Sequence, residues 1–200
     1  NCSANASYIS YLAKADTKLY GIAVVTTDGK IFKAGDADYL FPVESIAKVF
    51  TLAHVLKTQG YEALQKKIGV NATGLPFNSA LAIELNNDKL TGSPPPGNPL
   101  VNAGAIAAVS LVEGDTPDAK WEALFNTASA FAGHKLTLNK DVYNSEMADN
   151  EHNLAIAVLL RSYNYLYADP AETIDVYTRE CSYNVTAKDL AVMGATLASG

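Results

Sequence analysis

The sequence predicts an α/β fold in which a small sheet part is joined to a larger helical part. Three features carry this prediction: a hairpin pattern at residues 19–34, an apolar helix that opens at Ser45, and a run of helical patterns after it. An isolated hairpin is marginal in water, so it makes a poor sheet by itself. Either the chain is an unusual, mostly helical protein, or the remaining strands of the sheet lie beyond Gly200.

The hairpin is predicted from its turn. Two apolar runs flank Asp28-Gly29, and this dipeptide favours a tight turn because both central positions need a positive φ angle. Strands are therefore expected at about residues 19–27 and 30–34. A short helix with one apolar face is expected before them, within residues 7–19.

The helical part begins with a helix that runs from Ser45 to about Thr58 and is ended by Gly60. Apolar residues cover nearly its whole circumference, which is typical of a buried helix, and residues 100–112 have the same character. A loop with three consecutive prolines is expected at residues 86–99. Further helices are expected in the ranges 61–68, 78–85, 118–133, 153–166, 169–181 and 186–198.

Size and composition fit a soluble globular protein. The chain has 200 residues, of which 48% are hydrophobic and 18% charged, and this is enough apolar material for a sizeable core. The formal net charge of −6 and the lack of a basic stripe argue against a nucleic-acid partner. The longest apolar stretch is too short to span a bilayer. We therefore expect a cytoplasmic protein without membrane or nucleic-acid partners.

Cysteine and histidine spacing gives no metal site. Cys2 and Cys181 are far apart and lack metal-ligand spacing, so both are expected to be reduced thiols. The three histidines also show no ligand spacing: His54, His134 and His152. No metal and no cofactor are expected.

The segment FPVESIAKVF places Ser45 and Lys48 three positions apart in an apolar run. On a helix these residues share a face, so the two side chains can touch. Serine becomes a nucleophile when a base takes its proton, and burial can make lysine neutral enough to be that base. The alternative is an ordinary surface lysine at the edge of an amphipathic helix. A Ser-x-x-Lys pair that follows a hairpin and precedes a helical insertion is the layout of penicillin-recognising serine enzymes.

Longer segments extend this likeness over almost the whole chain: AGDADYLFPVESIAKVF, PFNSALAIEL, NPLVNAGAI, SEMADNEHNLAIAVLL and DVYTRECSYNVTAKDLAVMGATLASG. With them the chain resembles the serine-dependent glutaminases, and the bacterial ones most closely. The resemblance implies a β-lactamase/transpeptidase-like fold, conversion of L-glutamine to L-glutamate and ammonia, no cofactor, and a homo-oligomer (dimer or tetramer). It divides the chain into a sheet part at residues 1–50, a helical domain at 51–185, and a return to the sheet part at 186–200.

The resemblance also implies roles for individual residues. Ser45 would be the acylated nucleophile, Lys48 its base, and Tyr177 a proton relay to Ser45 and to the leaving ammonia. Substrate binding would involve Ser45 and Tyr177 together with four further residues: Tyr8, Asn102, Glu146 and Asn153. Two positions depart from the family pattern, since Ser10 stands where proline is usual and His152 where arginine is common.

Each role has a structural alternative. Glu146 could be an acid favoured by the dipole at a helix N-terminus, and Asn153 could be only a helix cap. Asn102 could make a structural hydrogen bond in a buried segment, and Tyr177 could be a core residue. Two other functions also stay open: a β-lactamase or D,D-peptidase on the same scaffold, and a non-catalytic fragment that acts only in assembly.

The resemblance implies that relatives begin earlier and continue past residue 200 into further strands and a second oxyanion-hole donor. We therefore expect residues 1–200 alone to lack activity and to aggregate. The hairpin should have unpaired edges, and apolar side chains such as Val24 and Ile31 should be more exposed than a core allows.

Overall fold

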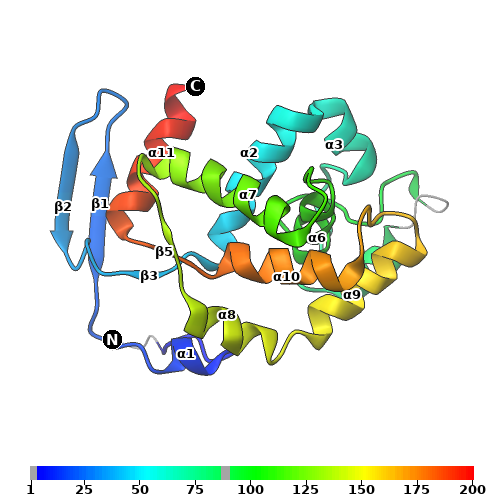
Figure 1. The fold of residues 1–200 in the computed structure, drawn as a ribbon, viewed down its shortest axis with the longest axis horizontal. Coiled ribbons are helices and arrows are strands. Elements are labelled where there is room, and N and C mark those ends of the chain that lie inside the picture. The colour runs from blue at the N-terminus through cyan, green and yellow to red at the C-terminus, as the bar shows by residue number, and fades with distance from the viewer. Residues whose placement is uncertain (1–3, 87–90) are drawn as a thin grey trace.

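The computed structural model describes residues 4–86 and 91–200 and shows a helical body with a β-hairpin at one side (Figure 1). The predictions for Cys2 and for residues 87–90 of the proline-rich loop lie outside the described residues. The strands are β1 (Gly21–Val25), β2 (Ile31–Gly35), β3 (Phe41–Pro42), β4 (Thr137–Leu138) and β5 (Tyr183–Val185). The helices are α1 (Ser10–Ala13), α2 (Ala47–Gln59), α3 (Tyr61–Lys67), α4 (Ala80–Leu85), α6 (Asn102–Ser110), α7 (Pro117–Ala132), α8 (Lys140–Met147), α9 (Glu151–Ser162), α10 (Pro170–Cys181) and α11 (Ala187–Ser199), with a 3-10 turn at Glu44–Ile46.

The predicted hairpin is present, with β1 and β2 antiparallel and Val25 opposite Ile31. Gly29 has a positive φ angle of 85°, but Asp28 does not, so the expectation of a positive φ at both residues is wrong. The turn lies one residue earlier, because the N–H of Gly29 donates to the Thr26 carbonyl and makes Thr27 and Asp28 its central residues. Helix α11 packs against β1 (Figure 1). Among the described residues this sheet has only these two strands. The expected exposure is confirmed, since Val24 is 52% and Ile31 47% exposed.

A second, three-stranded sheet was not predicted. It has the order β3-β5-β4, and each strand has only two or three residues, which is too short for an alternating pattern in the sequence. Its central strand joins α10 to α11, and the backbone N–H of Val43 donates to the carbonyl of Tyr183. This small sheet therefore holds the turn before α2 next to the end of α10.

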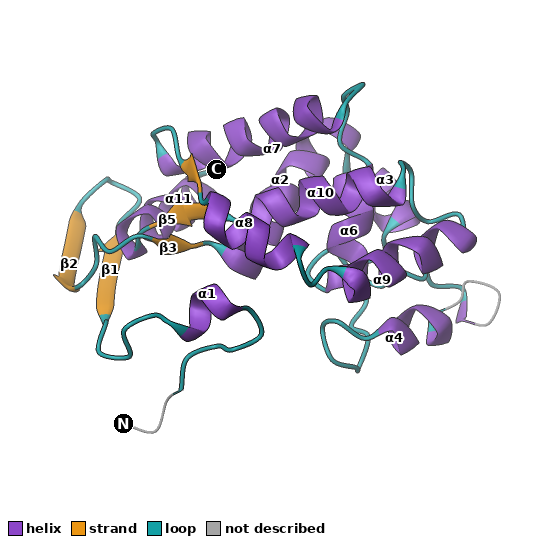
Figure 2. Ribbon diagram, turned by 60° about the horizontal axis from the view of Figure 1, so that its bottom comes forward, coloured by secondary structure: helices purple, strands orange, loops and turns teal. Residues whose placement is uncertain are grey.

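Helix α6 forms the centre of the helical body and contacts α2, α9 and α10 (Figure 2). All nine of its residues are buried, as predicted for the apolar segment 100–112. Gly104 is required by close packing, because a Cβ atom there would lie 1.7 Å from the carbonyl oxygen of Asn98.

Helix α2 corrects the prediction of a helix buried all round. Leu56 is 39% exposed, and Ile46 in the 3-10 turn just before the helix is 44% exposed, because α2 packs on α6 and α7 and its other side faces outward. Helix α8 was also missed, because its sequence KDVYNSEM is mostly polar and gives no clear apolar period.

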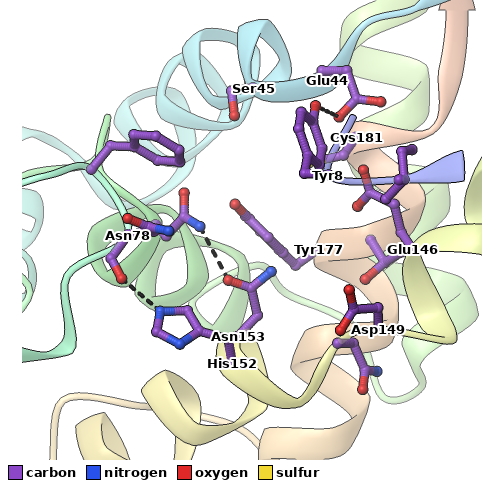
Figure 3. A pocket seen from close by; sticks show the side chains of 15 residues that line it. Tyr8, Glu44, Ser45, Asn78, Glu146, Asp149, His152, Asn153, Tyr177 and Cys181 are labelled. Carbon is purple, nitrogen blue, oxygen red and sulfur yellow. Dashed lines mark hydrogen bonds between the residues drawn. The ribbon is translucent and has the colours of Figure 1, made fainter. Parts of the chain in front are cut away.

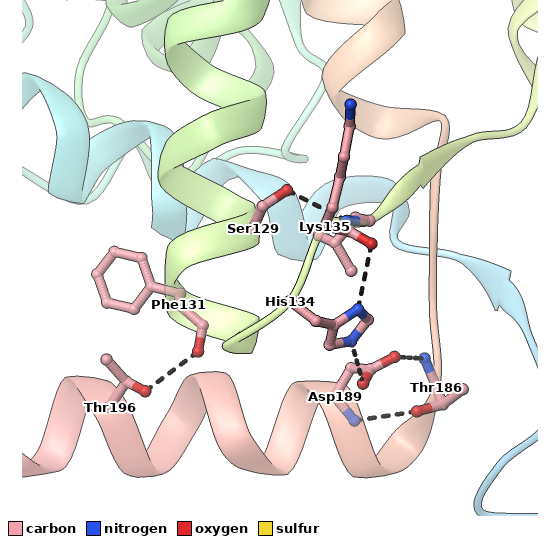
Figure 4. Close-up of polar contacts among 8 residues, drawn as sticks. Ser129, Phe131, His134, Lys135, Thr186, Asp189 and Thr196 are labelled. Carbon is pink, nitrogen blue, oxygen red and sulfur yellow. Dashed lines mark hydrogen bonds and ion pairs between the residues drawn. The ribbon is translucent and has the colours of Figure 1, made fainter.

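Helices α10 and α11 begin at capping residues. Asp169 accepts hydrogen bonds at the start of α10, and Thr186 and Asp189 form a reciprocal capping box at the start of α11. Asp189 also contacts His134 with an Nε2–Oδ1 distance of 2.9 Å (Figure 4). Hydrogen bonding to Asp189 raises the pKa of His134. This contact joins the segment after α7 to α11, the helix that covers the hairpin.

Candidate active site

A cavity of about 390 Å³ collects residues from distant parts of the chain (Figure 3). The segment before α1, the 3-10 turn, the loop before α4, and parts of α6, α8, α9 and α10 form its wall. Six of the seven predicted site residues line it: Tyr8, Ser45, Asn102, Glu146, Asn153 and Tyr177. The seventh, Lys48, is buried behind Ser45 and is only 3% exposed.

Ser45 and Lys48 are in direct contact. Lys48 Nζ lies 2.7 Å from Ser45 Oγ, because the 3-10 turn leads directly into α2 and the two residues are one turn apart. Burial lowers the pKa of Lys48, although the nearby carboxyl groups of Glu180 and Glu146 oppose this effect. A lysine that is neutral part of the time can accept the proton of the serine it touches.

Tyr177 faces Lys48 from α10. Lys48 Nζ lies 5.9 Å from the centre of the Tyr177 ring and equally far from that of Phe77. Tyr177 is 3% exposed, and burial raises the pKa of its hydroxyl well above the ordinary value. The hydroxyl is therefore protonated at neutral pH and can donate a hydrogen bond or a proton inside the cavity.

Two asparagines meet on the opposite side of the cavity. Asn102 Nδ2 donates to Asn153 Oδ1 over 3.1 Å, and the backbone N–H of Asn102 donates to the Phe77 carbonyl over 2.8 Å. Asn102 Oδ1 is buried and has no hydrogen-bond partner among the described residues, so it can accept one from a ligand. Asn153 lies inside the first turn of α9, which begins at Glu151, so the alternative of a helix cap is wrong.

Glu146 lies near the C-terminal end of α8, so the alternative of an acid at a helix N-terminus is also wrong. Its carboxyl group is close to that of Glu44, and Tyr8 donates a hydrogen bond of 2.8 Å to Glu44 Oε2. Burial raises the pKa of Glu146 to about 8, and the charge of Glu44 and a hydrogen bond to it act in the same direction. This side of the cavity can bind a cationic group.

Several cavity residues were missed by the sequence analysis: Glu44, Phe77, Asn78, Asp149, Asn150 and Cys181. Glu44 gave a usable signal, because it is a charged residue in an apolar run directly before Ser45. Phe77 and Asn78 line the cavity because the folded chain brings their loop there, and the local sequence gives no sign of this. His152, one of the residues that depart from the family pattern, holds this loop through a contact of 2.7 Å from Nε2 to the Asn78 carbonyl (Figure 3).

Glu180 was also missed. It is fully buried behind Lys48 and accepts a hydrogen bond from Thr51 Oγ1, while its Oε1 has no partner among the described residues. Burial raises its pKa to about 8, and the Thr51 hydrogen bond and the charge of Lys48 oppose this rise. Burial thus favours the neutral form of Glu180, which weakens its attraction for the Lys48 charge.

Replacement of Glu180 by glutamine is expected to flatten the pH dependence of stability. The pKa of Glu180 rises from 4.5 to about 8 on folding, so the folded protein binds more protons and stability falls as pH rises through this interval. Thermal unfolding between pH 5 and 8 should therefore show a smaller loss of Tm in Glu180→Gln than in the unaltered protein. Exposed Glu172 on the same helix is the control, since Glu172→Gln should keep the original slope. Equal slopes in all three proteins would contradict this account.

Residues 4–86 and 91–200 contain no group of three or more histidine, cysteine or acidic side chains that could hold a metal ion. In the same part of the chain no helix combines the length and apolar character needed to cross a membrane. The histidines contact hydroxyl, carbonyl or carboxylate oxygens, for example His54 Nδ1 with Thr127 Oγ1 at 2.8 Å.

Known proteins are similar to this chain in sequence and in fold. A family model described as Glutaminase matches residues 4–200. The chain belongs to the glutaminase family. It is 53% identical to a glutaminase of Brucella canis and 50% identical to one of Mycobacterium ulcerans, each over 98% of this chain. It spans about 60% of the length of these curated relatives.

Solved glutaminase structures agree in fold. A protein described as "Probable glutaminase ybaS" has a TM-score of 0.94 and 46% identity, covering 100% of this chain and 63% of that one. A Bacillus glutaminase has a TM-score of 0.83 and 32% identity, covering 89% of this chain and 58% of that one. These likenesses confirm the predicted α/β fold of the β-lactamase-like type.

Proposed function

We propose that the protein is a glutaminase that hydrolyses L-glutamine to L-glutamate and ammonia through a γ-glutamyl ester on Ser45. The observation that carries this proposal is the 2.7 Å contact between Ser45 Oγ and a buried Lys48 Nζ at a cavity that also presents an amide pair and a carboxyl group. The family membership of the chain supports the same activity.

The acylation step uses the serine and the lysine. Neutral Lys48 removes the proton of Ser45 Oγ as this oxygen attacks the side-chain amide carbon of glutamine. The tetrahedral intermediate carries its negative charge on the former carbonyl oxygen, and the backbone N–H of Ser45 is one donor for it. Lys48 and Tyr177 then transfer a proton to the amide nitrogen, ammonia leaves, and the ester remains.

Deacylation repeats these steps with water. Lys48 takes a proton from a water molecule that attacks the ester carbon, and the proton returns to Ser45 Oγ when the bond breaks. The products are glutamate and the free serine, so the chemistry balances without a redox partner. Tyr177 is neutral before and after each transfer, because it takes up a proton from Lys48 as it passes one on, and burial raises its pKa.

The rest of the cavity would hold the amino-acid end of the substrate. Glu146 is placed to accept hydrogen bonds from the α-ammonium group, and Tyr8 supports it through Glu44. Asn102 and Asn153 offer amide groups for the remaining polar atoms of the substrate. A substrate without an α-ammonium group would lose the charge-assisted hydrogen bond to Glu146 and would be used less well.

The direct test is hydrolysis by the full-length protein. L-Glutamine should give equal amounts of glutamate and ammonia, whereas a chromogenic β-lactam should not be opened. Turnover of the β-lactam without glutamine hydrolysis would favour the rival β-lactamase function. No turnover of either would favour a protein that acts only in assembly. The homo-oligomeric state, the cytoplasmic location and the lack of nucleic-acid or membrane partners stay predictions.

Replacement of Glu146 by glutamine is expected to weaken glutamine use more than folding. A hydrogen bond to a charged group contributes about 1.5–3 kcal/mol, so kcat/KM should fall about 10- to 100-fold. Thermal unfolding should change little, because glutamine keeps the shape of the side chain. Exposed Glu151 gives the control variant Glu151→Gln, which should keep its kcat/KM. An unstable Glu146→Gln protein with normal kinetics would make Glu146 a structural residue.

A further inference from the structure

Glu44 has an unusual backbone conformation directly before the nucleophile. Its φ angle is +51°, in the left-handed region that a residue with a side chain adopts only when the surroundings impose it. The Glu44 side chain extends toward Tyr8 and lies on the same side of the cavity as Glu146 (Figure 3). A strained residue at a reactive site is an observation that calls for a functional explanation.

The two oxygens of Glu44 are in different situations. Oε2 accepts the hydrogen bond from Tyr8, whereas Oε1 is buried and meets no permanent donor among the described residues. Glu44 and Glu146 are within hydrogen-bonding reach of each other. A proton on Glu146 therefore supplies a donor for Glu44 that the empty site otherwise lacks.

Two adjacent carboxylates exceed the charge of the single ammonium group of glutamine. Like charges in a shared, partly desolvated site disfavour double ionisation, so one proton is retained by the pair. Burial and Glu44 together raise the pKa of Glu146 to about 8. The Lys48 charge lowers both pKa values, and the hydrogen bond from Tyr8 lowers that of Glu44. Three further titratable side chains line the same cavity: Tyr177, Cys181 and Asp149.

We propose that Glu44 is a positioning residue that shares one proton with Glu146 in the empty site, and that the α-ammonium group of the substrate displaces this proton. The proton leaves to solvent, and the N–H groups of the ammonium take its place. The net charge of the pair and its contents is −1 before binding and −1 after it, since two carboxylates then face one cation. This inference rests on the proposed function and adds a pH-dependent selection for substrates with a free α-ammonium group.

Proton release on binding tests the inference. Full-length Ser45→Ala protein binds glutamine without turnover, so calorimetry at pH 7 in two buffers of different ionisation enthalpy counts the protons released. We expect about one proton per glutamine bound. In Ser45→Ala with Glu44→Gln, the pKa of Glu146 should fall, because the charge of Glu44 is removed, and the count should drop by at least about half. A count that Glu44→Gln leaves unchanged would overturn the inference.

Asp149→Asn is the matched control, because Asp149 also lines the cavity and the substitution removes one negative charge there. Asp149→Asn should leave the number of released protons unchanged. An equal drop in both variants would mean that Glu44 contributes only negative charge to the cavity, and this would overturn its role as the partner of Glu146. Binding with no proton release in the parent protein would also overturn the inference while leaving the proposed function intact. No binding or hydrolysis of glutamine at any pH would instead remove the proposed function itself.

Kinetics give an independent readout, because Glu44 neighbours Ser45 and its substitution can also alter kcat. In the unaltered protein KM for glutamine should fall about tenfold per pH unit between pH 6 and 7.5, since the displaced proton becomes easier to remove. In Glu44→Gln the inflection of this profile should move by at least about one unit toward acid pH. A lower kcat with an unchanged KM profile would show only a local disturbance of Ser45 and would contradict the proposal.

Discussion

Replacement of Ser45 by alanine is expected to lower kcat for glutamine hydrolysis by about a millionfold. Ser45 Oγ is the atom that would form the ester, and it lies 2.7 Å from Lys48 Nζ. Loss of a nucleophile that acts together with its base typically removes nearly all the rate that the group provides. The fold should be unaffected, because Ser45 is exposed at the cavity and alanine suits the 3-10 turn.

Ammonia release by the full-length protein measures this effect. Ser162→Ala, an exposed serine at the end of α9, is the matched control and should keep kcat within about twofold. A kcat of Ser45→Ala within tenfold of that of the unaltered protein would contradict the assignment of Ser45 as nucleophile.

Replacement of Lys48 by arginine is expected to remove activity almost completely. A guanidinium stays charged at all accessible pH values, so it cannot accept the serine proton. Loss of a general base costs about 10²- to 10⁴-fold, and more when base and nucleophile act as a unit. Lys48→Met fills a similar volume without a charge, so it should be equally inactive while staying folded.

The pH dependence of the hydrolysis rate tests the same role of Lys48. Burial lowers the pKa of Lys48, so activity should fall as pH drops through that value and the lysine becomes protonated. Lys57→Arg, at an exposed position in the last turn of the same helix, should keep both rate and profile. An active Lys48→Arg protein would contradict the assignment of Lys48 as base, and so would a rate that is flat from acid to alkaline pH.

Features encoded by a few neighbouring residues were predictable. Asp28-Gly29 indicated the place of the hairpin turn, though not its type, and Thr186 with Asp189 indicated the start of α11, because turns and caps depend on local backbone and side-chain geometry. The strands of the second sheet were not predictable in this way. They are two or three residues long and exist because distant segments meet, as Val43 meets Tyr183.

The candidate site also has a part that the local sequence predicts and a part that depends on distant segments. The contact of Ser45 with Lys48 followed from helical spacing alone, whereas the resemblance to glutaminases supplied the more distant partners. Glu44 and Glu180 were missed because their importance depends on burial and on partners such as Glu146 and Thr51, which lie far away in the sequence. The strained backbone of Glu44 had no sequence signal, since non-glycine residues rarely adopt a positive φ angle.

The most direct measurement is a search for the covalent intermediate. Full-length protein mixed with L-glutamine and stopped with acid should carry one glutamyl group in ester linkage on the peptide that contains Ser45, as seen by peptide mass mapping. The adduct should be absent from Ser45→Ala and should disappear when glutamine is exhausted. Steady glutamine hydrolysis with no adduct at Ser45 under any quench condition, or an adduct on another residue, would contradict the account.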